Sequence, residues 1–392
     1  MISFSRFKHS MVALVMALVL HSFGNSASAA VNNEGGEHAT AHHTEEKKEA
    51  KKGFDAKEVI LGHVKDAHDW HFMDWGEQPI SIPLPVIIYN PAKGTSAFMS
   101  SAFHHGHEAV DGYMIVTEHY REEKGLAQDK FPTGTIIAVD EQHNPTGAKI
   151  YDFSITKNIT SMIIAAILLV WMMLNVAKAY KTRGSKKAPK GFQSVVEPVI
   201  IFMRDEVVKP NIPGKAAEKY TPFILTIFFF ILILNLMGLL PGSANVTGNI
   251  AVTGALAIIS FVAIMISTNK HFWGHIFNPP VPGGVKIILA PVELIGVFTK
   301  PVSLAIRLFA NILAGHIIIL SIISLVFIFG GLKPVAGYGF LPITIVFNIV
   351  MMMLELLVAF IQAFIFATLT AVFIGQAMEG GHDHDDAHAA HH

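Results

Sequence analysis

The sequence predicts an all-α membrane protein with five transmembrane helices, a membrane-surface amphipathic helix and a small, β-rich extracytoplasmic N-terminal region. Only 15% of the 392 residues are charged and 52% are hydrophobic, whereas a soluble domain carries about 25% charged residues. Uncharged runs of membrane-spanning length fill the second half of the chain, and short apolar runs between turn residues lie in the first half. These proportions exclude a purely cytosolic enzyme.

Composition also excludes several kinds of chemistry. The chain has no cysteine, which rules out disulfides, Cys-ligated zinc or iron–sulfur centres and thiol catalysis. The formal net charge of −1 provides no basic field for nucleic acid. Glycine pairs such as Gly283-Gly284 lack the phosphate-loop pattern. We therefore expect no cofactor, no nucleotide site and no nucleic-acid partner.

Composition divides the chain into four segments. The first has the layout of a secretory signal peptide, with basic residues, a short apolar core and a small-residue cleavage site that ends at Ala29. An uncleaved membrane helix is the alternative, but an apolar core of about ten residues is too short to span a bilayer. The segments are a signal peptide at 1–29, a polar periplasmic region at 30–152, a membrane part at 153–378 and a His/Asp-rich cytoplasmic tail at 379–392.

The polar region has two parts. Up to about Lys57 it is rich in Glu, Lys, Ala and His, and we expect it to be disordered or loosely helical. Beyond it, apolar runs at 80–89, 112–116 and 135–139 alternate with turn residues, as short strands do. Two histidine groups lack the ligand spacing of a metal site, and we expect neither to bind a metal: His63, His68 and His71 with Asp66 and Asp69, and His104, His105 and His107.

Lysine and arginine indicate the orientation of the spans. Six basic residues and no acid lie between 178 and 190, which places that loop in the cytoplasm, and the uncharged connection at 241–249 fits the outside. The N-terminus is then periplasmic and the C-terminus cytoplasmic, in the cell inner membrane. The five runs of about 20 residues or more, the length that crosses a bilayer, are 159–177, 222–242, 246–269, 308–332 and 334–378.

Three stretches differ from simple spans. Residues 191–211 alternate apolar and charged side chains, which predicts an amphipathic helix on the cytoplasmic membrane surface, although a soluble loop helix fits the pattern equally well. Residues 285–330 and 341–378 form helices of roughly 67 and 55 Å at 1.5 Å per residue, against a hydrocarbon core of about 30 Å. Either they break at Pro291 and Pro301, or they form a long, steeply tilted hairpin. Packing against the curved side of another membrane assembly is a reason for such a tilt.

Five ionisable side chains lie within these last helices: Glu293, Lys300, Arg307, His316 and Glu355. Charge at that depth costs about 2.5–3.5 kcal/mol per residue on insertion scales, so a functional role is the default hypothesis. Snorkelling or interhelical pairing is the alternative, above all for Glu293 and Lys300 near the cytoplasmic end. The sequence around Arg307 offers no local counter-ion, and we expect its carboxylate partner to come from another subunit.

Helix geometry separates these groups. Glu293 precedes Arg307 by fourteen residues, so the two share a face but lie ~21 Å apart along the axis. His316 follows Arg307 by nine residues and lies on the opposite face. Glu355 and Gln362 are seven residues apart and share a face, and Glu355 can face His316. A histidine–carboxylate pair titrates near neutral pH and suits a proton relay.

Several motifs carry a family resemblance. Residues 303–315, SLAIRLFANILAG, resemble the signature of subunit a of F-type ATP synthases. The likeness extends to LLVAFIQAFIFATLT at 356–370, NLMGLLP at 235–241 and EPVIIFMRDEVVKPN at 197–211. It covers roughly residues 150–378, and the Arg307 motif together with Gln362 makes it specific.

The resemblance implies a mechanism. Arg307 is then the essential arginine that faces a ring of c subunits, releases the proton from an incoming c-ring carboxylate and separates two aqueous half-channels. Asn311 and Gln362 line its neighbourhood. Arginine keeps its charge at every physiological pH, so it acts as an electrostatic barrier and not as a proton carrier.

The same resemblance implies roles for four more residues. His316 and Glu355 belong to the periplasmic half-channel, where some family members carry these two residue types in the reverse order. Glu293 lines the cytoplasmic exit, and Asn235 lies near an aqueous path.

The implied partners are the c-subunit ring, the b subunits of the peripheral stalk, the rest of the ATP synthase and membrane lipid. The chain itself is non-catalytic, because ATP chemistry lies on other subunits. The alternative is a stand-alone secondary cation or proton transporter, which predicts internal repeats around a midplane site; the sequence has no such repeat. The polar N-terminal region is extra relative to compact bacterial members, and either docks on a partner's periplasmic surface or is a passive extension.

Overall fold

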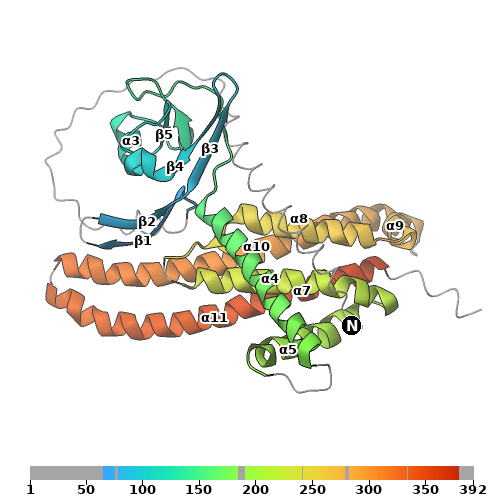
Figure 1. The fold of residues 1–392 in the computed structure, drawn as a ribbon. Coiled ribbons are helices and arrows are strands. Elements are labelled where there is room, and N and C mark those ends of the chain that lie inside the picture. The colour runs from blue at the N-terminus through green and yellow to red at the C-terminus, as the bar shows by residue number, and fades with distance from the viewer. Residues whose placement is uncertain are drawn as a thin grey trace, which may run out of the picture.

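The computed structural model describes residues 65–75, 78–183, 190–240, 242–278, 282–332 and 334–378. The predicted signal peptide, the stretch up to Lys57 and the His/Asp-rich tail lie outside these residues. Figure 1 shows a lobe of strands and short helices beside a layer of long helices. We call these the extramembrane domain and the membrane part.

The extramembrane domain contains three small antiparallel sheets in the described residues. Strand β3 pairs with β4 and with β7, and its side chains alternate between the core and the surface, with Val86 and Ile88 fully buried. The strands are β1 (Asp69–Trp75), β2 (Gln78–Pro83), β3 (Pro85–Asn90), β4 (Gly94–Met99), β5 (Tyr113–Ile115), β6 (Ile136–Ala138) and β7 (Tyr151–Asp152), joined by a 3-10 helix, η1 (Ser100–Gly106), and by α3 (Glu118–Glu123).

The predicted β-rich region is confirmed, with corrected boundaries. The run at 80–89 is two strands, because Pro83 and Pro85 flank Leu84 and proline cannot donate to a strand ladder. Strand β4 was missed, since GTSAFM lacks a strong apolar alternation. Gly94 has φ +89°, a conformation that glycine adopts easily, and it allows the tight turn between β3 and β4.

The two histidine groups that the sequence singles out lie in and before the extramembrane domain. His68 is buried and its Nε2 lies 2.9 Å from Asp152 Oδ2, while Asp66 Oδ1 accepts from the Ala67 and Asn158 backbone amides. Among the described residues no three His, Asp or Glu side chains are placed to hold a metal ion. His63 and the side chains of His71 and His105 lie outside the described part.

The membrane part confirms five helices that are long and apolar enough to cross a membrane in the described chain. In Figure 1 the first of them crosses the others obliquely, and the hairpin of the last two extends beyond the rest. They are α4 (Lys157–Arg183), α7 (Gly214–Gly238), α8 (Ile250–Ser267), α10 (Gly283–Leu332) and α11 (Pro334–Met378), with the short helices η3 (Val246–Gly248) and α9 (Lys270–Phe277) between them.

Several predicted helix boundaries were wrong. Helix α7 begins eight residues before position 222, because Lys215, Glu218 and Lys219 lie in its first turns and a charge-free criterion cuts it short. Helix α10 continues through Pro291 and Pro301, so the predicted alternative of a break is wrong. At 1.5 Å per residue α10 is ~75 Å long, more than twice the ~30 Å thickness of a hydrocarbon core.

The predicted amphipathic helix is only partly a surface element. It comprises α5 (Phe192–Phe202), a π-helical turn η2 (Met203–Val208) and α6 (Lys209–Asn211). The side chains of Met203 and Val208 are fully buried in the core of the membrane part. The second half of the segment therefore packs against α7 and α11, because its apolar residues have partners there that the sequence alone did not reveal.

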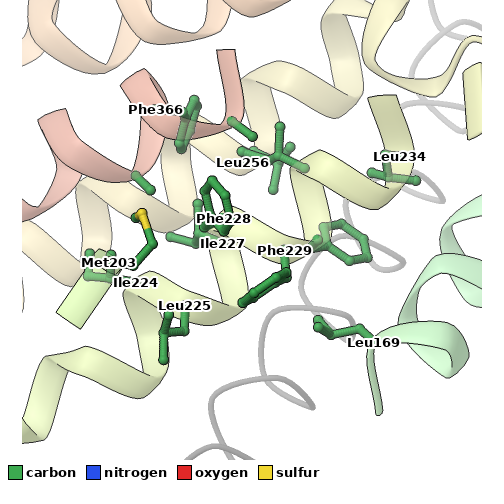
Figure 2. Close-up of a cluster of buried hydrophobic side chains, with 14 of the residues drawn as sticks. Leu169, Met203, Ile224, Leu225, Ile227, Phe228, Phe229, Leu234, Leu256 and Phe366 are labelled. Atoms are coloured by element: carbon green, nitrogen blue, oxygen red, sulfur yellow. The ribbon is translucent and has the colours of Figure 1, made fainter. Parts of the chain in front are cut away.

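Helix α7 forms the centre of the membrane part. Its Ile227, Phe228 and Phe230 are fully buried, and Figure 2 shows this cluster between Leu169 of α4, Leu256 of α8 and Phe366 of α11. Such side chains stabilise the packing of helices through many small van der Waals contacts. The core holds α4, α7, α8 and α11 together.

Hydrogen bonds between described residues attach the extramembrane domain to one end of the membrane part, which we call the domain end. The indole Nε1 of Trp70 donates to the Gly242 carbonyl at 2.7 Å. The Lys157 amide donates to the Ala67 carbonyl at 3.0 Å, and the Asn158 amide to Asp66 Oδ1 at 3.2 Å. Burial raises the pKa of Asp66. The domain thus contacts both the start of α4 and the connection between α7 and α8.

Candidate functional site

The candidate site lies in the antiparallel hairpin of α10 and α11. A Cβ at Gly337 would lie 2.7 Å from Gly330 Cα, so the two helix backbones nearly touch near the turn. The rings of Phe329 and Phe340 stack there with centroids 4.4 Å apart. These contacts define how residues of α10 pair with residues of α11 along the hairpin.

Glu355 lies opposite Gly315. A Cβ at Gly315 would lie 3.2 Å from Glu355 Oε1, so glycine provides the space for this carboxyl group. Glu355 is only 6% exposed, and the structure shows no hydrogen bond or ion pair for it within the described residues. His316, the next residue on α10, is half-buried, and its pairing with Glu355 stays a prediction.

The hairpin register brings Gln362 to the level of Arg307. Gln362 follows Glu355 by seven residues on α11, and seven residues back from Gly315 on α10 is Leu308, beside Arg307. Gln362 is 6% exposed and Leu308 is buried. Sequence predicted Arg307 and Gln362 as one site, and the antiparallel pairing is what places them at one depth.

Arg307 itself is half-buried, and Asn311, four residues later, is exposed. Residues four apart share a helix face, so the two mark one side of α10. In the described part of the chain the Arg307 guanidinium makes no hydrogen bond or ion pair. An unpaired guanidinium at membrane depth is costly, which makes this position stand out in the fold.

Asn235 joins α7 to the same stretch of α11. Its Nδ2 donates to the Ala359 carbonyl at 3.0 Å, and Ala359 lies between Glu355 and Gln362 on α11. Asn235 is 2% exposed, and its Oδ1 is buried without a partner among the described residues. The third helix of the site is therefore α7.

Glu293 and Lys300 lie on α10 before Arg307. Glu293 is half-buried and lies about 21 Å along the helix from Arg307. Lys300 Nζ lies 3.2 Å from Gln376 Oε1 and 4.8 Å from the centroid of the Phe373 ring. Both partners are on α11, so Lys300 is an interhelical contact, the alternative that the sequence left open.

Burial distinguishes this hairpin from the rest of the membrane part. In the most apolar stretch of α10 only 11% of the residues are buried, against 72% in α7. A helix apolar on all sides is normally buried in protein or in a membrane. The hairpin therefore has a large apolar face free for lipid or a partner, with Arg307 and Asn311 on it.

Chemically, the site combines a fixed cation with a nearby neutralisable acid. Arginine keeps its charge, whereas a carboxyl group such as that of Glu355 can exchange a proton. Of the two amides on the facing helices, Gln362 is level with Arg307, and Asn235 reaches the Ala359 carbonyl, between Glu355 and Gln362 on α11. Sequence reasoning missed Gly315 as the residue that makes room for Glu355. Its position within the SLAIRLFANILAG motif was visible, but its partner across the hairpin was not.

Comparison with known proteins covers both parts of the chain. A family model described as "ATP synthase A chain" matches residues 159–375, and one described as a domain of unknown function matches residues 59–153. ATP synthase subunit a of Chloroherpeton thalassium is 43% identical over 242 residues, 61% of this chain and 71% of that protein.

Two further relatives agree. ATP synthase subunit a of Chlorobium phaeobacteroides (strain DSM 266) is 42% identical over 248 residues, covering 62% of this chain and 70% of the relative. ATP synthase subunit a of Myxococcus xanthus is 40% identical over 240 residues, covering 60% and 76%. The family match spans more than half of this chain and includes every helix of the hairpin site. The chain belongs to the F-type ATP synthase subunit a family, the proton-translocating membrane subunits of that complex.

Proposed function

We propose that this chain carries protons to and from a ring of c subunits through two aqueous half-channels, with Arg307 as the electrostatic separator between them. A proton that enters on one side protonates a c-ring carboxylate, and the carboxylate releases its proton on the other side after the ring has turned past Arg307. Moving one charge across the membrane provides about 2.3 kcal/mol per 100 mV. The chain couples that free energy to ring rotation and hence to ATP synthesis.

The observation that carries this proposal is the state of Arg307. It is half-buried on the apolar, exposed face of α10, level with Gln362, and it has no acidic partner in the described chain. A carboxylate from a neighbouring c subunit would supply the missing ion-pair partner of Arg307. Such an arrangement stabilises the ionised carboxylate only while it is opposite the arginine.

The remaining site residues divide between the two half-channels. Glu355 and His316 belong to the half-channel on the domain side, together with Asn235, which reaches α11 beside Glu355. Glu293 lines the exit on the other side of Arg307. Asn311 shares the Arg307 face of α10 and lines the arginine's surroundings.

The proposed setting is the cell inner membrane. The N-terminus and the extramembrane domain lie in the periplasm, because six basic residues lie in the last turns of α4 and directly after it, at its other end, and the C-terminus lies in the cytoplasm. The partners are the c-subunit ring, the b subunits of the peripheral stalk and surrounding lipid. The chain performs no ATP chemistry itself and needs no cofactor.

The test is Arg307→Ala in the assembled complex, measured as ATP-driven proton pumping in inverted membrane vesicles. We expect pumping to be lost while the complex still assembles and hydrolyses ATP. Arg121→Ala is the matched control, because Arg121 binds Thr133 within the extramembrane domain; we expect it to pump normally. Normal pumping by the Arg307 variant would refute the proposal. Purification of the chain without an ATP-hydrolysing complex would favour the stand-alone transporter instead.

A further inference from the structure

The connection between α7 and α8 enters the interior of the membrane part. Ala244, Asn245 and Val246 on it are at most 3% exposed, and η3 packs against α4, α7, α8 and α10. The Trp70 indole holds the start of this connection through the Gly242 carbonyl. The connection is therefore a buried plug at the domain end, attached to the extramembrane domain.

Asn245, a polar residue of this plug, uses only one half of its side-chain amide for hydrogen bonding within the described chain. Its Oδ1 accepts a hydrogen bond from the Gly248 amide at 3.0 Å. A Cβ at Gly248 would lie 2.5 Å from Asn245 Nδ2, so the glycine makes room for the amide. The Nδ2 atom is buried and has no hydrogen-bond partner among the described residues.

Asn235 on α7 has a buried amide oxygen, Oδ1, that could accept such a hydrogen bond. Asn245 Oδ1 lies 3.8 Å from the position of a Cβ at Gly238, and Asn235 precedes Gly238 by three residues on α7. Residues three apart are neighbours on one helix face, about 5–6 Å between Cβ atoms. An unused donor, Asn245 Nδ2, thus lies about one helical turn from an unused acceptor, Asn235 Oδ1.

Leaving two such buried groups unsatisfied costs about 1–3 kcal/mol each. Buried water that makes 2–4 hydrogen bonds is the usual way in which such groups are satisfied. Water between Asn245 and Asn235 would accept from one amide and donate to the other. Asn235 in turn contacts Ala359, four residues from Glu355 on the same face of α11.

We propose that Asn245 is a further residue of the proton path: with Asn235 it holds a short file of water that leads from the plug toward Glu355. This inference rests on the function proposed above. Along the file each transfer forms one O–H bond as another breaks, so no group is oxidised or consumed. Trp70 acts as a positioning residue, because it holds the connection that carries Asn245.

The test compares Asn245→Ser with Asn249→Ser in the complete complex. Serine can still cap the Gly248 amide but lacks Nδ2. Asn249 is the matched control, because it caps α8 through the Ala251 amide and its side chain is not among the buried unsatisfied groups in the described chain. We expect ATP-driven pumping to fall about threefold to tenfold in Asn245→Ser, the rate equivalent of one lost hydrogen bond, and to stay unchanged in Asn249→Ser.

Two measurements distinguish a role of Asn245 in proton transfer from a purely structural role in packing. When proton transfer becomes limiting, the ratio of pumping rates in H₂O and D₂O should rise in Asn245→Ser; slower pumping with an unchanged ratio would overturn the proposal. The double variant with Asn235→Ala should pump no more slowly than the slower single variant, because both residues hold one file. If the double variant instead pumped more slowly by the product of the two single effects, the proposal would also be overturned.

Assembly and the proposed function are controlled separately. If Asn245→Ser does not assemble, Asn245→Thr also keeps a capping hydroxyl oxygen, lacks Nδ2 and is measured in the same way with the same expected results. Loss of pumping in Arg307→Ala together with normal pumping in the Asn245 variant would overturn this inference alone. Normal pumping in Arg307→Ala would overturn the proposed function.

Discussion

Gly375 on α11 lies directly against the segment that precedes α7. A Cβ at this position would overlap the Asn211 carbonyl oxygen and lie 2.9 Å from the Asn211 carbonyl carbon. The obstacle is backbone, which cannot rotate away as a side chain can. Asn211 is also fixed locally, since its Nδ2 donates to the Val207 carbonyl at 2.7 Å and the next residue, Ile212, is 1% exposed.

Gly375→Ala is therefore expected to destabilise the membrane part. Alanine gains about 0.5–1 kcal/mol over glycine in a helix, but forcing a methyl group into a filled space costs about 1–3 kcal/mol. From the middle of each range the net loss is about 1 kcal/mol, which corresponds to a midpoint about 1–2 °C lower for a chain of 392 residues at about 2.1 cal/mol/K per residue. The assay is thermal unfolding of the purified protein in detergent, followed by loss of soluble, monodisperse protein.

Gly296→Ala on α10 is the matched control. It is also a glycine within a long helix, but a Cβ there meets nothing within 4 Å. We expect its midpoint to be unchanged or slightly higher, through helix propensity alone. An unchanged midpoint for Gly375→Ala, or equal losses for the two variants, would show that the close approach of α11 to Asn211 does not stabilise the fold.

Two further predictions concern the extramembrane domain. Trp70→Phe removes the indole donor to the Gly242 carbonyl, and we expect faster amide hydrogen exchange at 242–249; unchanged exchange would mean that this bond does not hold the connection. Burial raises the pKa of Asp152, but the hydrogen bond and charge of His68 and the hydrogen bonds of Ser154 outweigh it and lower that pKa. The resulting stabilisation is present above the ordinary carboxyl pKa of about 3.9 and is lost as pH falls through the lowered folded value. Asp152→Asn should therefore lower the melting temperature at pH 7 and make less difference at pH 3; an equal deficit at both pH values would contradict this sign.

The sequence was informative where one local signal was enough. Charge-free length predicted the five membrane helices, and the Arg307 motif with Gln362 predicted the family. Local signals gave wrong predictions for where a helix begins and for which apolar residues are buried inside the protein. Charges in the first turns of α7 hid its start, and the apolar residues of η2, which sequence placed on a membrane surface, pack in the interior.

The site shows the same division. Its ionisable residues were visible because charge is rare and costly in apolar helices. Their pairing was not, because which residue of α10 faces Glu355 depends on the register of two helices rather than on spacing within one. That register places Gly315 against Glu355.

By itself the sequence determined that the chain is a membrane protein, that Arg307 has no acid nearby along the chain, and which family it resembles, because composition and motifs are local properties. Only the tertiary structure decided that Gln362 lies level with Arg307, that Gly375 admits the Asn211 carbonyl, and that Asn245 and Asn235 present unused groups one helical turn apart. These relations depend on contacts between segments distant in the chain. Packing of rigid helices defines such contacts to within a fraction of a side chain, and no single stretch of residues encodes them.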